Sequence, residues 1–225
     1  RDAIYARYPG SAVIYGDTDS VMVIFAGATA DAAGVRRTFA LGDEAAAWIT
    51  AHTFPSRFIE LEMEKVYWPY ILYKKKRYAG LMFMHSEDTG TVDTKGLENV
   101  RRDNCALLRS TLETVQDHIL HHRVPAALAV LGEVLDELGA QKTPIAQLQI
   151  SKTLRTGYAS TNLPHVQVVE RMKRRADPDV DIPRSGDRVQ YVVMQSHNKN
   201  AKVYERTEDP DYVRQQKLPL DWLYY

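Results

Sequence analysis

Two acidic residues separated by one position, Asp17 and Asp19, are the side chains of this 225-residue chain whose spacing most suggests chemistry. Two carboxylates about 4 Å apart repel each other by about 1 kcal/mol in water, and by more in drier surroundings. A folded chain relieves this repulsion by protonating one carboxyl group or by placing a cation between the two. Hard oxygen ligands suit Mg²⁺, which binds a few carboxylates together with substrate phosphates.

Two such ions about 3.5–4 Å apart can stabilise the attacking and leaving oxygens of an in-line phosphoryl transfer. The acidic pair lies in "SAVIYGDTDSVMVIF", residues 11–25. Asp is also common in turns, where it caps its own backbone, so an ordinary hairpin is the alternative interpretation. Taken by itself, the pair is compatible with both interpretations.

The elements on either side of the pair would position it. Strong strand formers predict β-strands at 12–16 and 20–25, joined by a turn at 16–19. Side chains two positions apart on a strand share a face, so Asp17 and Asp19 could converge on one point as they leave the hairpin.

A helix and further strands are predicted after this hairpin. An Ala-rich amphipathic pattern predicts the helix over 31–52, and Phe54-Pro55 ends it. Strands are predicted at 58–73 (a pair bent at Pro69), at 77–84, and at 91–96 after a turn at 87–90. The first ~95 residues therefore indicate an α+β fold, with a mainly antiparallel sheet and a helix packed against it.

The pattern changes after Gly96 and becomes largely helical. Helices are predicted at 97–122, 125–139 and 163–177, followed by a strand at 186–196. We therefore predict a boundary near residue 96, with one domain over 1–96 and a second, largely helical domain over 97–225.

Net charge neither favours nor excludes a nucleic-acid partner. The chain has 29 basic and 29 acidic side chains, so any such role must come from local clustering. The segment 65–78, "KVYWPYILYKKKRY", has five basic residues, five aromatic residues and no acidic residue. Basic groups neutralise phosphates and can donate to minor-groove acceptors. A solvated, charged strand end is the alternative.

Other candidate residues carry weaker signals. His118 and His122 have a spacing that can bind zinc, but no third ligand is evident and no zinc site is expected. The single cysteine, Cys105, excludes an internal disulfide and is expected to be a small buried residue.

No apolar run reaches the roughly 18 residues of a membrane span, so no membrane partner is expected. The sequence also lacks an initiator Met and a signal peptide, so we expect a fragment of a longer protein.

Four segments, in order, resemble family B DNA polymerases. "YGDTDS" at 15–20 resembles motif C, which forms a hairpin in the palm, and "KKRYAG" at 75–80 resembles the palm motif that touches the primer–template duplex. "KGLENVRRDN" at 95–104 resembles the segment that enters the thumb, and "GDRVQYVV" at 186–193 resembles a later thumb segment. The segment "LEMEKVYWPYILYKKKRYAG" at 61–80 also resembles delta-type replicative polymerases and their relatives in large DNA viruses.

The resemblance implies the C-terminal part of a palm over 1–96 and a truncated thumb over 97–225. It implies transfer of a nucleotide from a dNTP to a DNA primer 3′-OH with two Mg²⁺ ions. Asp19 would bridge the metals with a carboxylate outside the chain, and Asp17 is the less certain second ligand. The implied DNA contacts are Lys76 and Tyr78 at the minor groove or primer terminus, Lys75 and Arg77 in support, and Lys95, Arg101 and Arg102 near the duplex backbone.

Alternatives to these contacts stay open. Arg101 and Arg102 could instead pair with Glu98 and Asp103 on a helix surface. The basic run "RMKRR" at 171–175 could contact phosphate or serve only solubility.

The family's other active-site motifs are expected before residue 1: a further palm Asp, and the fingers Lys and Tyr that grip the nucleotide. The 225-residue segment alone is therefore expected to be inactive. A sliding clamp and accessory subunits would bind through regions outside the chain. The resemblance implies a nuclear protein if it is a eukaryotic enzyme, and otherwise a viral replication compartment. The alternatives are a non-catalytic, duplex-binding polymerase paralogue and, more remotely, another two-metal phosphotransferase such as a cyclase.

Overall fold

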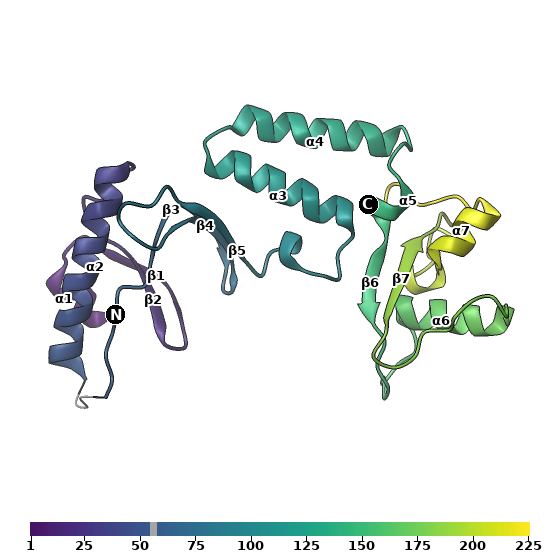
Figure 1. Ribbon diagram of the computed structural model, residues 1–225, viewed down its shortest axis with the longest axis horizontal. Coiled ribbons are helices and arrows are strands. Elements are labelled where there is room, and N and C mark those ends of the chain that lie inside the picture. Colours follow the sequence, from purple (N-terminus) through teal and green to yellow (C-terminus); the bar gives the residue numbers. More distant parts are fainter. Residues whose placement is uncertain (55–57) are drawn as a thin grey trace. The chain divides into compact units, whose positions relative to one another are not determined.

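The computed structural model describes residues 1–54 and 58–225, which form two compact units, Arg1–Leu97 and Glu98–Tyr225 (Figure 1). Helices and small antiparallel sheets are present together, so the predicted α+β class is confirmed. None of the helices in these residues is long and apolar enough to cross a membrane.

The first unit begins with a helix–hairpin–helix arrangement around a small core. The strands β1 (Ala12–Asp17) and β2 (Ser20–Ile24) form the predicted hairpin. The helices α1 (Asp2–Arg7) and α2 (Ala32–Thr53) contribute Ile4 and Ala45, which pack with Phe25 beside the hairpin. The predicted helix over 31–52 is confirmed, whereas Pro55, its predicted terminator, lies outside the described residues.

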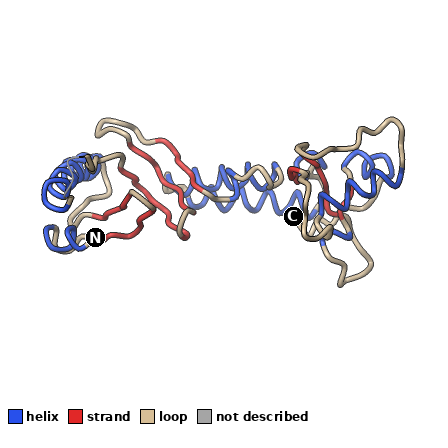
Figure 2. The backbone as a smooth tube through the Cα atoms, turned by 90° about the horizontal axis from the view of Figure 1, so that it is seen from below, coloured by secondary structure: helices blue, strands red, loops and turns tan. Residues whose placement is uncertain are grey.

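A separate three-stranded sheet follows, so the strands of this unit form two sheets and not one (Figure 2). Its order is β3 (Val66–Lys74), β4 (Arg77–Phe83) and β5 (Thr91–Lys95), all antiparallel. Of the predicted strand pair over 58–73, only the second part is confirmed, as β3. Residues 58–65 form no strand, and the backbone N–H of Leu61 donates to the side chain of Thr50. The sheet tolerates Pro69 because β3 is an edge strand with an irregular register at that point.

The second unit combines a helical hairpin with a mixed layer of helices and strands. The helices α3 (Ala106–Leu120) and α4 (Val124–Gly139) lie side by side (Figure 1). The remaining elements are α5 (Ile145–Leu148), β6 (Ile150–Thr153), α6 (Pro164–Arg175), β7 (Arg188–Val193), β8 (Thr207–Glu208), α7 (Pro210–Gln216) and two 3₁₀ turns, η1 (Glu98–Val100) and η2 (Val203–Glu205). Their buried residues, such as Leu148, Val168 and Val192, form the main core.

The helix predicted over 97–122 starts later than expected. Residues 101–105 form a turn, in which the Asn104 side chain donates to the carbonyl of Glu98. Such side-chain bonds compete with helical hydrogen bonds, so α3 begins only at Ala106. It also ends at Leu120, so His122, with φ 59°, lies beyond the helix that carries His118.

The structure also contains short elements that were not predicted, namely α1, α5, β6, β8 and α7. The strand β6 has four residues and β8 has two, and both pair with β7 from distant parts of the chain. Patterns this short carry little periodicity, so their strand state depends on long-range pairing.

Candidate functional site

A pocket of about 350 Å³ in the first unit brings the central predicted residues together. Its walls come from the β1–β2 hairpin, the β3–β4 turn and the end of β5. They comprise Tyr15, Asp17, Thr18, Asp19, Ser20, Met22, Lys76, Tyr78 and Lys95. Five of these were candidate site residues, and they come from three segments that are far apart in the sequence.

The two carboxylates reach this pocket from different backbone settings. Asp17 is the last residue of β1 and is paired with Ser20, whereas Asp19 lies in the two-residue turn between the strands. The turn requires a left-handed residue, Thr18, with φ 56°. The expectation that both carboxylates share a strand face is therefore wrong, although both line the same pocket.

Asp17 is held by two donors. The ammonium of Lys76 donates to Asp17 Oδ2 at 2.6 Å, and the Tyr15 hydroxyl donates to the same oxygen at 3.1 Å. These hydrogen bonds, first the one from Lys76, lower the pKa of Asp17, and Asp17 in turn raises the pKa of Lys76. Because the folded-state pKa of Asp17 is depressed, the pair persists above the ordinary Asp pKa and is lost only as the pH falls through the lowered value.

Tyr15 closes a ring of interactions around this ion pair. Its hydroxyl oxygen accepts a hydrogen bond from the backbone N–H of Lys76 at 3.0 Å, and the same hydroxyl donates a hydrogen bond to Asp17. Lys76 lies in the β3–β4 turn with φ 63°, and its backbone N–H donates to Tyr15 on the β1–β2 hairpin. The sequence interpretation did not assign Tyr15 a role, although it lies in the quoted segment 15–20.

Four tyrosines pack together at the pocket, and two of them, Tyr15 and Tyr78, line it. Tyr78 contacts Tyr15, Tyr67 and Tyr70, with ring centroids 5.9, 5.9 and 5.5 Å away. The Tyr70 hydroxyl donates to the sulfur of Met22, and burial raises the pKa of Tyr70 to about 12. These edge-on and tilted contacts fix the orientation of Tyr78 at the pocket wall.

Lys95 is held by a carboxylate that the sequence interpretation missed. Its ammonium donates to Asp93 Oδ1 at 2.8 Å, and the Tyr67 hydroxyl donates to Asp93 Oδ2 at 2.6 Å. Residues 93 and 95 share a face of β5, so a strand pattern that includes Lys95 could have identified Asp93.

The remaining predicted DNA contacts lie outside the pocket wall. Lys75 occupies the β3–β4 turn and Arg77 begins β4. Arg101 and Arg102 belong to the second unit, where they precede α3 and do not open it. Arg101 donates to Asp103 at 3.2 Å from two nitrogens, which is one of the pairings left open above.

The carboxylates of the pocket suit a hard cation such as Mg²⁺, which also binds water and phosphate oxygens. Within residues 1–54 and 58–225, no group of three or more His, Cys, Asp or Glu side chains could enclose a metal. Mg²⁺, however, binds through one or two carboxylates plus phosphates and water, and an open pocket with Asp17 and Asp19 suits that coordination. Asp19 is exposed, whereas one oxygen of Asp17 is already engaged by Lys76.

The weaker candidates have structural explanations. Burial raises the pKa of the Cys105 thiol, as expected for a core residue. His118 accepts a hydrogen bond from Arg123 Nε at 3.1 Å.

The basic run at 171–175 also has structural partners. Arg171 donates to the carbonyls of Tyr204, Glu205 and Thr207. Arg175 pairs with the buried Glu208 at 2.9 Å. These contacts favour a structural role for these two arginines over a phosphate contact.

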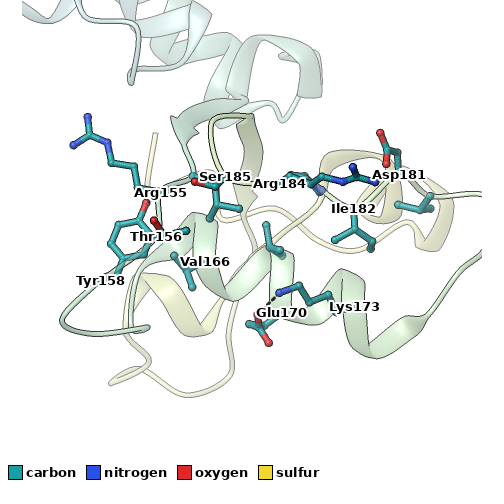
Figure 3. A pocket seen from close by; sticks show the side chains of 14 residues that line it. Arg155, Thr156, Tyr158, Val166, Glu170, Lys173, Asp181, Ile182, Arg184 and Ser185 are labelled. Carbon is teal, nitrogen blue, oxygen red and sulfur yellow. Dashed lines mark hydrogen bonds and ion pairs between the residues drawn. The ribbon is translucent and has the colours of Figure 1, made fainter.

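A second, larger pocket of about 640 Å³ lies between α6 and the loops that flank it (Figure 3). Lys173, from the basic run, lines it and pairs with Glu170 at 2.9 Å. The nine candidate site residues of the sequence interpretation are not among the residues that line this pocket.

Comparisons with known proteins agree with the four motifs. The chain matches DNA polymerase family B over residues 4–225. It is 43% identical over 217 residues to the DNA polymerase delta catalytic subunit of Mesocricetus auratus, covering 95% of this chain and 19% of that protein. The subunit of the same name from Candida albicans is 42% identical over 214 residues, covering 95% and 20%. The chain thus spans about a fifth of the length of these relatives.

A solved structure supports the same relationship. The family B DNA polymerase from the hyperthermophilic archaeon Pyrobaculum calidifontis is similar to the whole chain, with a TM-score of 0.63, 27% sequence identity and 26% of its own chain covered. Sequence and fold therefore agree along nearly all of the 225 residues. This chain belongs to DNA polymerase family B.

Proposed function

We propose that the chain is the C-terminal part of the palm, residues 1–96, and much of the thumb, residues 97–225, of a DNA-directed DNA polymerase of the delta type. One observation carries this proposal: the pocket joins Asp17 and Asp19 to Lys76, Tyr78 and Lys95. An acidic metal site next to basic and aromatic groups is the combination that nucleotide addition to a primer requires.

Asp19 is the main metal ligand in this proposal, and Asp17 is the second. Asp19 is exposed and, in the part of the chain that the structure describes, it has no hydrogen bond or ion pair. Two bound Mg²⁺ ions would stabilise the attacking primer 3′ oxygen and the leaving pyrophosphate oxygens. Because two carboxylates cannot hold two ions by themselves, a further carboxylate from outside the chain would complete the site.

Lys76 would contact the DNA when the duplex is present. Its side chain is 67% exposed even while it is paired with Asp17. From this position it could donate to minor-groove acceptors, which every base pair presents. Lys75 and Arg77 would support this contact, and Lys95, Arg101 and Arg102 would lie near the duplex backbone.

The wider assignments follow from the family. The substrates would be primer–template DNA and a dNTP, and a sliding clamp and accessory subunits would bind elsewhere on the full-length protein. A nuclear location is proposed for a eukaryotic enzyme, and a viral replication compartment otherwise. The alternative function, a non-catalytic duplex-holding paralogue, would require a metal site that has lost its remaining carboxylate.

Primer extension by the full-length protein tests the proposal. We expect template-dependent addition of dNTPs that requires Mg²⁺, and no addition by residues 1–225 alone, because the metal site is incomplete there. Duplex binding without any extension by the full-length protein would favour the paralogue. Extension by the 225-residue segment alone would contradict the proposed division of the site.

Replacing Tyr15 by Phe is expected to slow primer extension about tenfold without changing the fold. The hydroxyl bridges Asp17 and the backbone of Lys76, and hydrogen bonds to charged groups are the stronger class. The measurement is the single-turnover extension rate of the full-length protein.

Tyr70→Phe is the matched control for this substitution. It removes a hydroxyl from the same aromatic cluster, but that hydroxyl donates only to a methionine sulfur. We expect a change of less than about twofold, because sulfur is a weak acceptor. Equal effects of the two substitutions would show that the hydroxyl of Tyr15 has no special role.

A further inference from the structure

We propose that Asp93 is a positioning residue that holds Lys95, and through Tyr67 the tyrosine cluster, in place for the DNA duplex. The proposal rests on the function proposed above and adds a residue that neither the motifs nor the pocket lining identified. Asp93 lies on β5, two residues before Lys95, which lines the pocket.

The geometry assigns one donor to each carboxylate oxygen. Lys95 Nζ donates to Asp93 Oδ1 at 2.8 Å, and the hydroxyl of Tyr67 donates to Oδ2 at 2.6 Å. The Asp93 side chain is only 14% exposed, whereas that of Lys95 is 52% exposed. A mostly buried anion therefore fixes a cation that reaches solvent at the pocket wall.

A glycine makes the contact with Tyr67 possible. Tyr67 lies on β3 and Asp93 on β5, with β4 between them. Gly80 is the β4 residue opposite Asp93, and a Cβ atom there would lie 2.9 Å from the Tyr67 ring. Only a residue without a side chain lets the ring cross β4 so closely.

The charges of this network are stable near neutral pH. Burial acts to raise the pKa of Asp93, but the hydrogen bonds from Lys95 and Tyr67 outweigh it, and the pKa lies below its ordinary value. Burial and the contact with Asp93 raise the pKa of Tyr67, so its hydroxyl keeps the proton that it donates. Asp93 is thus an anion and Lys95 a cation under the conditions in which DNA binds.

The network links two predicted DNA contacts. Tyr78 is paired with Lys95 across β4 and β5, and its ring packs against that of Tyr67. A free lysine loses much rotamer freedom when it binds a phosphate. Because Asp93 already restricts Lys95, less of that loss remains when the duplex arrives.

The test compares Asp93→Asn, Lys95→Met and the double variant in the full-length protein. The readout is the dissociation constant for a primer–template duplex, measured by fluorescence anisotropy at several salt concentrations. We expect Lys95→Met to weaken binding about fivefold and to lower the salt slope by about 1. Asp93→Asn should weaken binding about threefold, and the double variant should bind no more weakly than Lys95→Met.

The sign of the Asp93→Asn effect separates positioning from simple charge. If Asp93 were only a negative charge near DNA, removing it would tighten binding. Tighter or unchanged binding by Asp93→Asn, additive losses in the double variant, or no loss in Lys95→Met would each overturn the proposal. Absence of duplex binding by the unmodified protein would instead refute the proposed function itself.

Two further variants serve as controls. Asp88→Asn controls for the change in charge, and Tyr67→Phe tests the Asp93 network without any change in charge. Asp88→Asn makes the same charge change at the other end of the β4–β5 hairpin, where Asp88 accepts the backbone N–H groups of Met84 and His85. It should change duplex affinity less than about 1.3-fold. Tyr67→Phe keeps every charge and removes one donor from Asp93, and it should weaken binding about twofold. Unchanged binding by Tyr67→Phe would overturn the link to the tyrosine cluster.

Discussion

Asp19→Ala in the full-length protein is expected to reduce primer extension at least about a thousandfold while duplex affinity changes less than about twofold. A metal ion contributes several kcal/mol of transition-state stabilisation, and each 1.4 kcal/mol or so is a factor of ten in rate. Asp19 is exposed in the β1–β2 turn, so its loss should not disturb packing. The measurements are single-turnover extension and anisotropy with the same primer–template.

Asp17→Asn is the informative comparison for this result. One oxygen of Asp17 already accepts hydrogen bonds from Lys76 and Tyr15, so we expect a smaller loss of extension, about ten- to a hundredfold. Near-normal extension by Asp19→Ala would show that Asp19 is not a metal ligand. A larger loss from Asp17→Asn than from Asp19→Ala would reverse the two roles.

Gly96→Ala is expected to destabilise the first unit by about 2–4 kcal/mol and to slow primer extension about tenfold or more. Gly96 has φ +64°, and a Cβ atom there would lie 2.1 Å from the backbone oxygen of Lys76. Such an overlap with backbone can be relieved only by moving the turn that carries Lys76. Thermal unfolding and primer extension of the same full-length preparation measure the two effects.

Gly157→Ala separates backbone strain from this clash. Gly157 has φ +75°, but nothing lies within 4 Å of the added Cβ atom. We therefore expect only the cost of the left-handed conformation, about 1 kcal/mol, with no change in extension. If Gly96→Ala costs no more than Gly157→Ala, the Lys76 turn does not depend on its contact with Gly96.

The sequence predicted the carboxylate hairpin well because its signal is local. Strand formers flank two turn residues, and the register of β1 and β2 follows from that short connection. The long helix after it has its own periodicity and an N-cap, Asp31, that accepts the N–H of Gly34 at 2.7 Å. Neither element needs information from distant residues to be recognised.

Prediction failed where local pattern and long-range pairing disagree. Residues 58–65 have strand-like composition but belong to none of the sheets in the described part of the chain. Conversely, β6 and β8 are too short to be recognised, yet both become strands beside β7. A segment forms a strand only when a neighbouring strand pairs with it, so its own residues determine its strand state only in part.

The sequence by itself determined which residues we propose for the chemistry: the acidic pair at 17 and 19, and the basic, aromatic segment at 75–80. Only the tertiary structure decided how they combine, since Lys76 contacts Asp17 from 59 positions away and Tyr67 reaches Asp93 from 26 positions away. The physical reason is that such contacts depend on how strands are aligned and on the space left by Gly80 and Gly96. Neither is expressed in the pattern of any single segment.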